Sequence, residues 1–384
     1  MASDRQPNCI RQGVTFAADA ETAICEIRDS IAQPEMTLAI LFIDPALGAE
    51  AVQAAMQRHW PDVPAIGTTA SGHISLLGLG TATISAVSLA APDFFAVADH
   101  LDCASEFDTS GVRAAVKRLV ARLDREAGHC DETNTFAMMF MAYKSMYEER
   151  ALNTIYGSLG GINLFGGAAS RVDAQKTCWV LHNGSVRRDS IAVALVHTSR
   201  PFALFSTHHF QGTGERLVIT GARPSERLVT EINGEPAALE YARLIGVSPE
   251  ELRGHVYIER PVAVKIGDQY YLRSIERVNE DGTLLFGCAL EIGTTLRVVT
   301  PQSMAANLET EFRRLRGVVG QPDLMIATDC AHRRLTLTSD NERNAVSRLL
   351  IEQNAVGFGS YGEQFNRTHL NHTLTGVAIG ARKP

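Results

Sequence analysis

The chain has 384 residues and a formal net charge of −7, with 45% hydrophobic and 21% charged residues. This composition excludes a largely disordered chain, the length exceeds what one hydrophobic core usually organises, and the absence of a basic cluster interleaved with aromatic residues argues against nucleic-acid binding. The start lacks a secretory apolar core and no apolar run approaches the roughly 18 residues of a membrane helix, so we expect a cytoplasmic protein without membrane contact.

A unit of strand, helix and glycine turn occurs three times along the chain. Its strands read LAILFID, TFAMMFMA and DLMIATDC, and each leads through a helical stretch to an apolar residue and a glycine. The intervals Ala51–Gly67, Arg150–Gly166 and Arg343–Gly359 have equal length. We expect these glycines to mark places where the backbone passes close to a neighbouring strand or a ligand.

Further strand-like runs follow the first two glycine turns, so each of these units reads β-α-β-β-β. Two such units predict a pseudo-symmetric α/β domain with mixed sheets over residues 10–218, in which residues 107–128 form a connecting helix. Residues 219–384 then form a second, α+β domain, with the boundary near residues 215–225. It should contain a turn at Asn233 and Gly234, a helix opened by Pro236, strands over residues 255–292, and the third repeat.

Two adjacent histidines, His208 and His209, end the apolar strand ALFSTHHF just before the interdomain segment. Because successive side chains of a strand point to opposite faces, only one of the two rings should enter a given pocket, and the other should lie outside it or in a neighbouring cleft. An exposed pair at a sheet edge is an equally weighted alternative. His59, His100 and His129 lie near element ends among polar residues and are interpreted as surface histidines.

A second polar cluster, Tyr361, Glu363, His369 and His372, lies between the third glycine turn and the apolar terminal strand. Ligand pockets commonly combine apolar walls with a few convergent polar groups, which is why this stretch is a candidate pocket wall. The alternative is that these side chains only fix an irregular loop through hydrogen bonds.

Evidence for catalysis or nucleotide binding is weak in this sequence. The segments Gly67–Gly72 and Gly166–Arg171 could cradle phosphate, but they match no phosphate-binding motif, so close strand packing is favoured. Cys330 and His332 could form a nucleophile and base, yet their spacing alone does not make a reactive pair, and no GxSxG or HExxH motif is present. We expect no enzymatic activity, with a hydrolase using Cys330 as an alternative.

Several separated motifs resemble the paired FIST N-terminal and C-terminal domains, in the expected order and over nearly the whole chain. These motifs are PAIGTTASGHIS, NLFGGAAS, HNGSVRRDSIAVAL, VTEINGEPAALEYARLIG, YYLRSI and GFGSYGEQ. The resemblance implies a non-catalytic sensory protein that binds a small molecule and acts in signal transduction. Within the family, STHHF and the ending YGEQFNRTHLNHTLTGVAIG resemble the NosP subgroup of haem-based nitric oxide sensors.

The subgroup resemblance implies haem b, held without covalent attachment because CxxCH is absent, with nitric oxide as ligand and a sensor histidine kinase as partner. It makes His209 or His208 the axial iron ligand, with His369 and His372 as lower-ranked candidates and Tyr361 and Glu363 in the same pocket. A sensor for another small ligand, such as an amino acid, without haem is the alternative. An assembly protein with an incidental pocket also stays open, as does a homo-oligomer.

Overall fold

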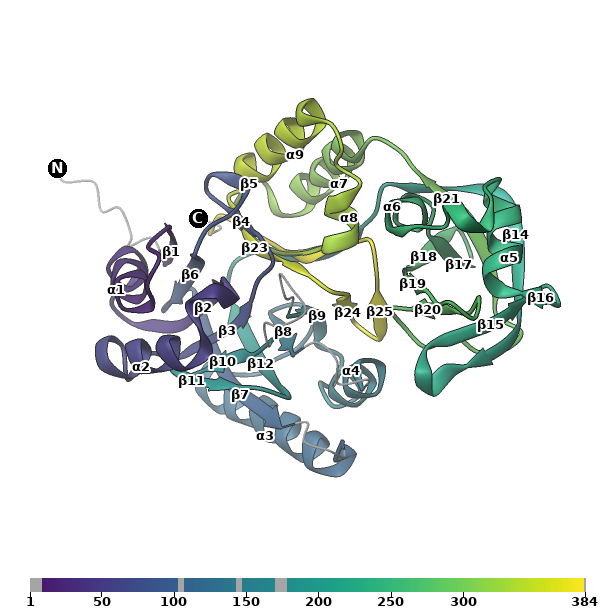
Figure 1. Ribbon diagram of the computed structural model, residues 1–384. Coiled ribbons are helices and arrows are strands. Elements are labelled where there is room, and N and C mark those ends of the chain that lie inside the picture. Colours follow the sequence, from purple (N-terminus) through teal and green to yellow (C-terminus); the bar gives the residue numbers. More distant parts are fainter. Residues whose placement is uncertain (1–8, 103–106, 143–146, 170–177, 383–384) are drawn as a thin grey trace.

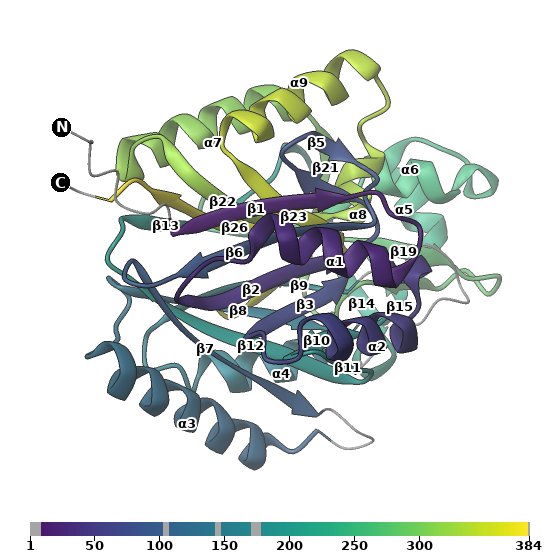
Figure 2. The same cartoon turned by 90° about the vertical axis from the view of Figure 1, so that its left-hand side faces the viewer.

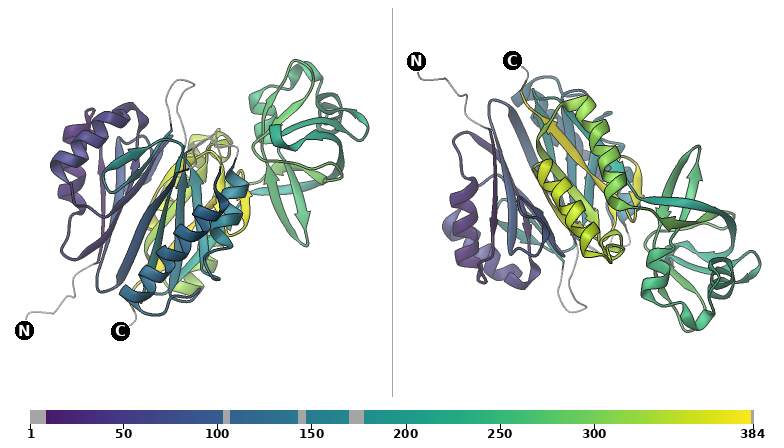
Figure 3. Two further views of the ribbon diagram at one scale, coloured as in Figure 1. Left: turned by 90° about the horizontal axis from the view of Figure 1, so that it is seen from below. Right: turned by 90° about the horizontal axis from the view of Figure 1, so that it is seen from above.

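The computed structural model describes residues 9–102, 107–142, 147–169 and 178–382. A body of three six-stranded mixed sheets carries a separate β-rich insertion at one end (Figures 1 and 3). The expected mixed α/β fold class is therefore confirmed. Within the described residues, no helix is long and apolar enough to cross a membrane.

Three units with one common order of elements build the body. The first consists of β1 (Ile10–Thr15), α1 (Ala20–Ile31), β2 (Met36–Ile43), the 3-10 turn η1 (Pro45–Leu47), α2 (Ala49–His59), β3 (Ala65–Thr69), β4 (His73–Ser75), β5 (Gly78–Gly80) and β6 (Ile84–Ala90). The second consists of β7 (Phe94–Asp102), α3 (Thr109–Ala127), β8 (Thr135–Met141), α4 (Glu148–Tyr156), β9 (Asn163–Ala168), β10 (Val180–His182), β11 (Ser185–Arg187) and β12 (Ser190–Thr198). The third consists of β13 (Phe202–Thr207), α7 (Met304–Val319), β22 (Pro322–Cys330), α8 (Ala331–Leu335), α9 (Asp340–Glu352), β23 (Ala355–Ser360), β24 (Glu363–Phe365), β25 (Thr368–Leu370) and β26 (Leu374–Gly380).

The three sheets exchange their hairpins in a cycle. The sheet of the first unit, β1-β6-β2-β3, is completed by the hairpin β10-β11 of the second unit. In the same way β24-β25 of the third unit completes the second sheet, and β4-β5 of the first unit completes the third sheet. Each unit thus receives a hairpin from one of the other units and gives its own hairpin to the remaining one, so the third repeat belongs to the same body as the first two.

Apolar side chains from all three units meet at the centre of the body. Phe42, Phe140 and Phe358 come from equivalent sheets, and their ring centroids lie 5.1 to 5.7 Å apart. The outer face of each sheet is covered by its unit's long helices, as Figure 2 shows for α1 and α2. Helices α1, α3, α7 and α9 begin at side-chain caps where their amphipathic stretches start; Asp19, for example, accepts the Thr22 backbone N–H at 2.8 Å.

The repeated glycines lie where two parallel strands leave no room for a side chain. A Cβ atom added to Gly67 would lie 2.6 Å from the Leu41 carbonyl oxygen, and one on Gly166 would lie 2.0 Å from the Met139 oxygen. Strand register makes Gly357, and not the Gly359 expected from equal spacing, the equivalent glycine of the third unit. Close strand packing therefore explains the glycines, while Ser170 and Arg171 of the second turn lie outside the described residues.

The insertion interrupts the third unit between β13 and α7. Its elements are β14 (Phe210–Arg223), η2 (Pro224–Glu226), β15 (Leu228–Ile232), β16 (Glu235–Pro236), α5 (Ala237–Ile245), η3 (Pro249–Glu251), α6 (Gly254–Glu259), β17 (Val262–Ile266), β18 (Gln269–Arg273), β19 (Ile275–Val278), β20 (Leu284–Phe286) and β21 (Thr295–Pro301). The predicted turn at Asn233 and Gly234 and the helix after Pro236 are present.

Two features of the insertion differ from the expectation. Residues 255–259 form part of helix α6 where a strand was predicted. The adjacent residues Val256 and Tyr257 both pack on the core of the insertion, whereas a strand would point them to opposite faces. The predicted boundary between residues 218 and 219 falls within β14, and segments on both sides of it contribute strands to the third sheet.

Candidate functional site

The candidate site lies where the insertion joins the body, a junction that Figure 1 shows. The chain leaves β13 through His208 and His209, enters the insertion at β14, and returns through β21 to α7. The carbonyl oxygen of His209 accepts the Gln302 backbone N–H at 2.7 Å, which holds the outgoing and returning strands together. A change at these residues is therefore placed to affect how the insertion sits on the body.

His208 and His209 line two different pockets, as expected, although both lie in the link between β13 and β14 and not within a strand. His208 faces a pocket of about 620 Å³, which we call the junction pocket. His209 borders a second cleft of about 520 Å³ between β21 and the segment that begins α9. The exposed sheet-edge alternative is wrong for His209, whose residue is only 4% exposed.

The junction pocket is lined by both the body and the insertion. The body contributes Tyr156 of α4 and residues of the β24-β25 hairpin, and the insertion contributes strand β18. Aromatic rings form much of the wall, and the Arg367 guanidinium lies 5.6 Å from the centre of the Tyr156 ring. The full lining is Tyr156, Ser206, His208, Gln269, Tyr270, Tyr271, Phe365, Asn366, Arg367, Thr368, Leu370 and Thr373.

The His208 ring is uncharged near neutral pH and is held by the backbone. Burial lowers its pKa, an effect that a hydrogen bond to the Tyr270 backbone partly opposes. The Phe210 N–H donates to His208 Nδ1 at 3.3 Å. His208 thus presents a neutral, oriented imidazole to the pocket.

His209 has a fixed tautomer with one bare nitrogen. Its Nε2 lies 3.1 Å from the Thr336 hydroxyl, and that hydroxyl donates its own proton to the Arg333 carbonyl oxygen at 2.7 Å. Nε2 must therefore carry the imidazole proton, which leaves a lone pair on Nδ1, and Nδ1 is buried without a hydrogen-bond partner. Burial lowers the pKa of His209 to about 3, with the Arg333 charge acting in the same direction.

A buried cluster next to His209 brings together His332, His372 and Arg333. The His372 ring centre lies 5.4 Å from that of His332 and 5.2 Å from that of Phe210, and both His372 nitrogens lack a partner. Arg333 is 1% exposed; it donates through Nη1 to Asp329 at 2.6 Å, whereas Nε and Nη2 have no partner. Such orphaned polar atoms are typical of a site that holds a bound water or small ligand.

Sequence reasoning missed most of this cluster. His332 was considered only as a partner of Cys330, and Arg333 was not considered at all. Both residues lie on α8, a short helix between β22 and α9 that the repeat pattern did not signal. Cys330 is fully buried, which raises the pKa of its thiol well above the usual value, and the His332 ring instead contacts the Ser274 hydroxyl at 3.2 Å. A thiolate nucleophile is disfavoured at this position.

The second predicted cluster does not converge on the junction pocket. Glu363 is buried, and it contacts the Ser360 hydroxyl at 2.6 Å and the Thr373 hydroxyl at 2.8 Å. Burial raises the pKa of Glu363 to about 8. His369 belongs to β25, and its Nδ1 lies 3.4 Å from the side-chain amide of Gln364 on β24. Tyr361 is half-buried and donates its backbone N–H to the Ala168 carbonyl oxygen.

A buried ion pair locks the insertion to helix α4 beside the pocket. Arg227 of the insertion lies 2.6 Å from Glu148 and 2.9 Å from Glu149, and the Glu149 carboxylate also accepts the Ala289 backbone N–H at 3.0 Å. The Arg227 and Glu148 side chains are only 7% and 2% exposed. The junction is therefore a defined contact between the two parts of the molecule.

Comparison with known proteins places this architecture in a family. The FIST N domain model matches residues 37–235 and the FIST C domain model matches residues 237–366. Among solved structures, the chain is similar to cyanuric acid hydrolase from A. caulinodans, with a TM-score of 0.41 and 8% identity over 97% of this chain and 99% of that one. A search of curated proteins gave no match. Because the family models cover most of the sequence, the chain belongs to the FIST family, whose domains are associated with small-ligand sensing in signal transduction.

Proposed function

We propose that the protein is a sensor whose small ligand binds in the junction pocket and biases how the insertion sits on the body. One observation carries this proposal: the pocket wall combines residues of α4 and the β24-β25 hairpin with residues of β18. A ligand there contacts both parts at once, so its binding free energy depends on their arrangement. Such differential contact is what a ligand needs to shift a conformational equilibrium.

The chemistry of the wall favours a small molecule with a carboxylate and an apolar or aromatic part. Arg367 supplies a cation, Gln269 and Asn366 supply amide donors and acceptors, and Tyr270 and Phe365 supply apolar rings. An amino acid has both parts. This occupant needs no metal and leaves the hydrogen bonds of the His208 ring intact.

Haem b is the second candidate occupant, and the observation that favours it is a neutral histidine in an aromatic-walled pocket. His208 would be the axial ligand, with Arg367 near the propionates, and the bound iron would supply the site for nitric oxide. Iron ligation has to replace a hydrogen bond that the His208 ring makes with the backbone. His209 fits this role less well, because its free Nδ1 is buried and its cleft has no aromatic wall.

Thermal unfolding of the purified chain in the presence of each proteinogenic amino acid tests whether an amino acid is the ligand of the junction pocket. We expect one or more to raise the midpoint, and Arg367→Ala to weaken that ligand about ten- to a hundredfold because a charge-assisted bond is lost. Arg313→Ala, an exposed arginine of α7 outside the pocket, is the control. Equal weakening by both variants would show that the ligand binds elsewhere.

Visible absorption of the chain after addition of haemin tests whether haem b is the ligand of the junction pocket. A Soret band that moves with nitric oxide is expected if haem is the occupant, and His208→Ala should shift or abolish it while His209→Ala keeps it. An unchanged band in His208→Ala contradicts the ligand assignment. If a kinase is the partner, the autophosphorylation rate of a candidate sensor histidine kinase should change on adding the sensor, and change again on adding the ligand.

A further inference from the structure

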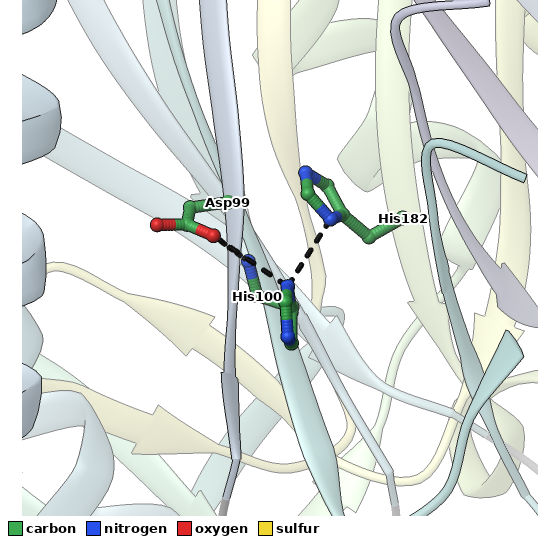
Figure 4. A group of neighbouring side chains, drawn as sticks. All are labelled: Asp99, His100 and His182. Atoms are coloured by element: carbon green, nitrogen blue, oxygen red, sulfur yellow. Dashed lines mark hydrogen bonds and ion pairs between the residues drawn. The ribbon is translucent and has the colours of Figure 1, made fainter. Parts of the chain in front are cut away.

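A group of side chains far from the junction pocket lies where two sheets of the body meet. His100 belongs to β7, the edge strand of the second sheet, and His182 ends β10, which completes the first sheet. Asp99 precedes His100 on β7. Figure 4 shows the two imidazoles facing each other, with the Asp99 carboxylate beside the His100 ring.

The distances between these side chains match those between ligands of one metal ion. His100 Nδ1 lies 3.2 Å from His182 Nδ1 and 3.5 Å from Asp99 Oδ1. The ligand atoms of all three residues lie within 4.8 Å of one another. In a tetrahedral site with metal–ligand bonds of roughly 2.0–2.1 Å, neighbouring ligand atoms are about 3.4 Å apart. The group is thus close to coordinating geometry before any ion is added.

The protonation states also suit a cation. Only one proton fits between two nitrogens 3.2 Å apart, so at least one lone pair points into the gap. The Asp99 carboxylate adds negative charge and is itself oriented by the His100 backbone N–H at 2.8 Å.

A second carboxylate lies on the far side of the His100 ring. Asp102 Oδ2 is 4.0 Å from His100 Nε2, and Arg187 Nη1 is 3.8 Å from the other oxygen of Asp102. A carboxylate in this position favours a proton on Nε2, and that tautomer leaves Nδ1 free to coordinate. Histidines that ligate metals usually donate their other ring N–H to a carboxylate, a backbone carbonyl or water, and Asp102 lies on that side of the ring.

We propose that Asp99, His100 and His182 bind a divalent transition-metal ion such as Zn²⁺ and so clamp the β10-β11 hairpin to β7. Two nitrogens and one oxygen are the ligand types that zinc takes, with water in the fourth position. Because the ligands come from two sheets, the ion ties the first unit's sheet to the second unit's edge. The site is independent of the junction pocket and of the sensor function.

Metal titration of the chelator-treated full chain tests this proposal. We expect one equivalent of Zn²⁺ to bind and to raise the unfolding midpoint, and Co²⁺ to give the visible bands of a tetrahedral complex. His182→Gln, which keeps the side-chain volume, and Asp99→Asn should abolish both effects. Asp102→Asn should weaken binding by about ten- to a hundredfold.

The control is His59→Ala, because His59 also pairs with a carboxylate, lying 2.6 Å from Glu21, but belongs to no group of three potential metal ligands among the described residues. This variant should bind zinc like the unaltered chain. Circular dichroism verifies the fold of each variant, and His100→Gln replaces any that does not fold. If the histidine and aspartate variants bind zinc as tightly as the control, or if the unaltered chain binds none, the proposal is wrong.

Discussion

Replacing Arg227 with alanine should loosen the insertion from the body and destabilise the molecule. The guanidinium bridges Glu148 and Glu149, and its removal leaves the Glu148 carboxylate buried without a compensating charge. Deleting one partner of a buried ion pair typically costs about 3–5 kcal/mol of stability. Ion pairs exposed on the surface contribute far less. We expect a loss of that size in the free energy of unfolding.

Urea denaturation followed by circular dichroism measures this loss. Arg223→Ala is the matched control, because Arg223 ends β14 close to Arg227 in the chain and pairs with Glu226 at 3.4 Å, yet its side chain is 49% exposed. That variant should change stability by less than about 1 kcal/mol. If Arg227→Ala also stays within about 1 kcal/mol of the unaltered chain, the junction is not held by this ion pair.

Two further predictions concern the body. Gly166→Ala should destabilise the protein by about 1–3 kcal/mol, because the new methyl group meets the Met139 carbonyl oxygen, whereas Gly317→Ala, in open space on α7, should be neutral or stabilising by up to about 1 kcal/mol in urea denaturation. Glu363→Gln should gain stability over the unaltered chain as pH rises. Burial raises the pKa of Glu363 in the folded state to about 8, above its unfolded-state pKa of about 4.5. The stability contributed by this carboxyl is therefore complete below about pH 4.5 and is lost as pH rises to about 8. Glutamine does not titrate, so the variant loses nothing over this range. The free energies of unfolding of the variant and the unaltered chain are compared at pH 5 and pH 8. If the advantage of the variant does not grow between these two pH values, Glu363 is already ionised in the folded protein.

Much of the body could be predicted from the sequence because its signals are local. The recurring order of strand, helix and glycine identified all three repeats, although equal spacing selected Gly359 in place of Gly357 in the third. The connecting helix predicted over residues 107–128 is α3 (Thr109–Ala127). The exchange of hairpins between units could not be predicted, since it depends on pairing between distant strands. For the same reason the contact between His100 and His182 was missed, and His100 was interpreted as a surface residue.

The candidate site was predicted only in part. His208 and His209 line different pockets, as predicted, but they lie in the irregular link between β13 and β14, so strand alternation is not what separates them. His369, Glu363 and His372 were grouped because they are close in sequence, but the β24-β25 hairpin sends them to different environments. Arg333 entered the buried cluster through α8, which no repeat pattern signals.

The most direct test of the sensor proposal is amide hydrogen exchange, measured with and without the amino acid or haemin that raises the unfolding midpoint. Simultaneous slowing in β18 (Gln269–Arg273) and in the β24-β25 hairpin is predicted, with altered exchange where β13 leads into β14. These changes should be lost in Arg367→Ala if the ligand is an amino acid, and in His208→Ala if it is haemin. Protection confined to one side of the junction, or absent from both, would contradict the proposal that the ligand bridges insertion and body.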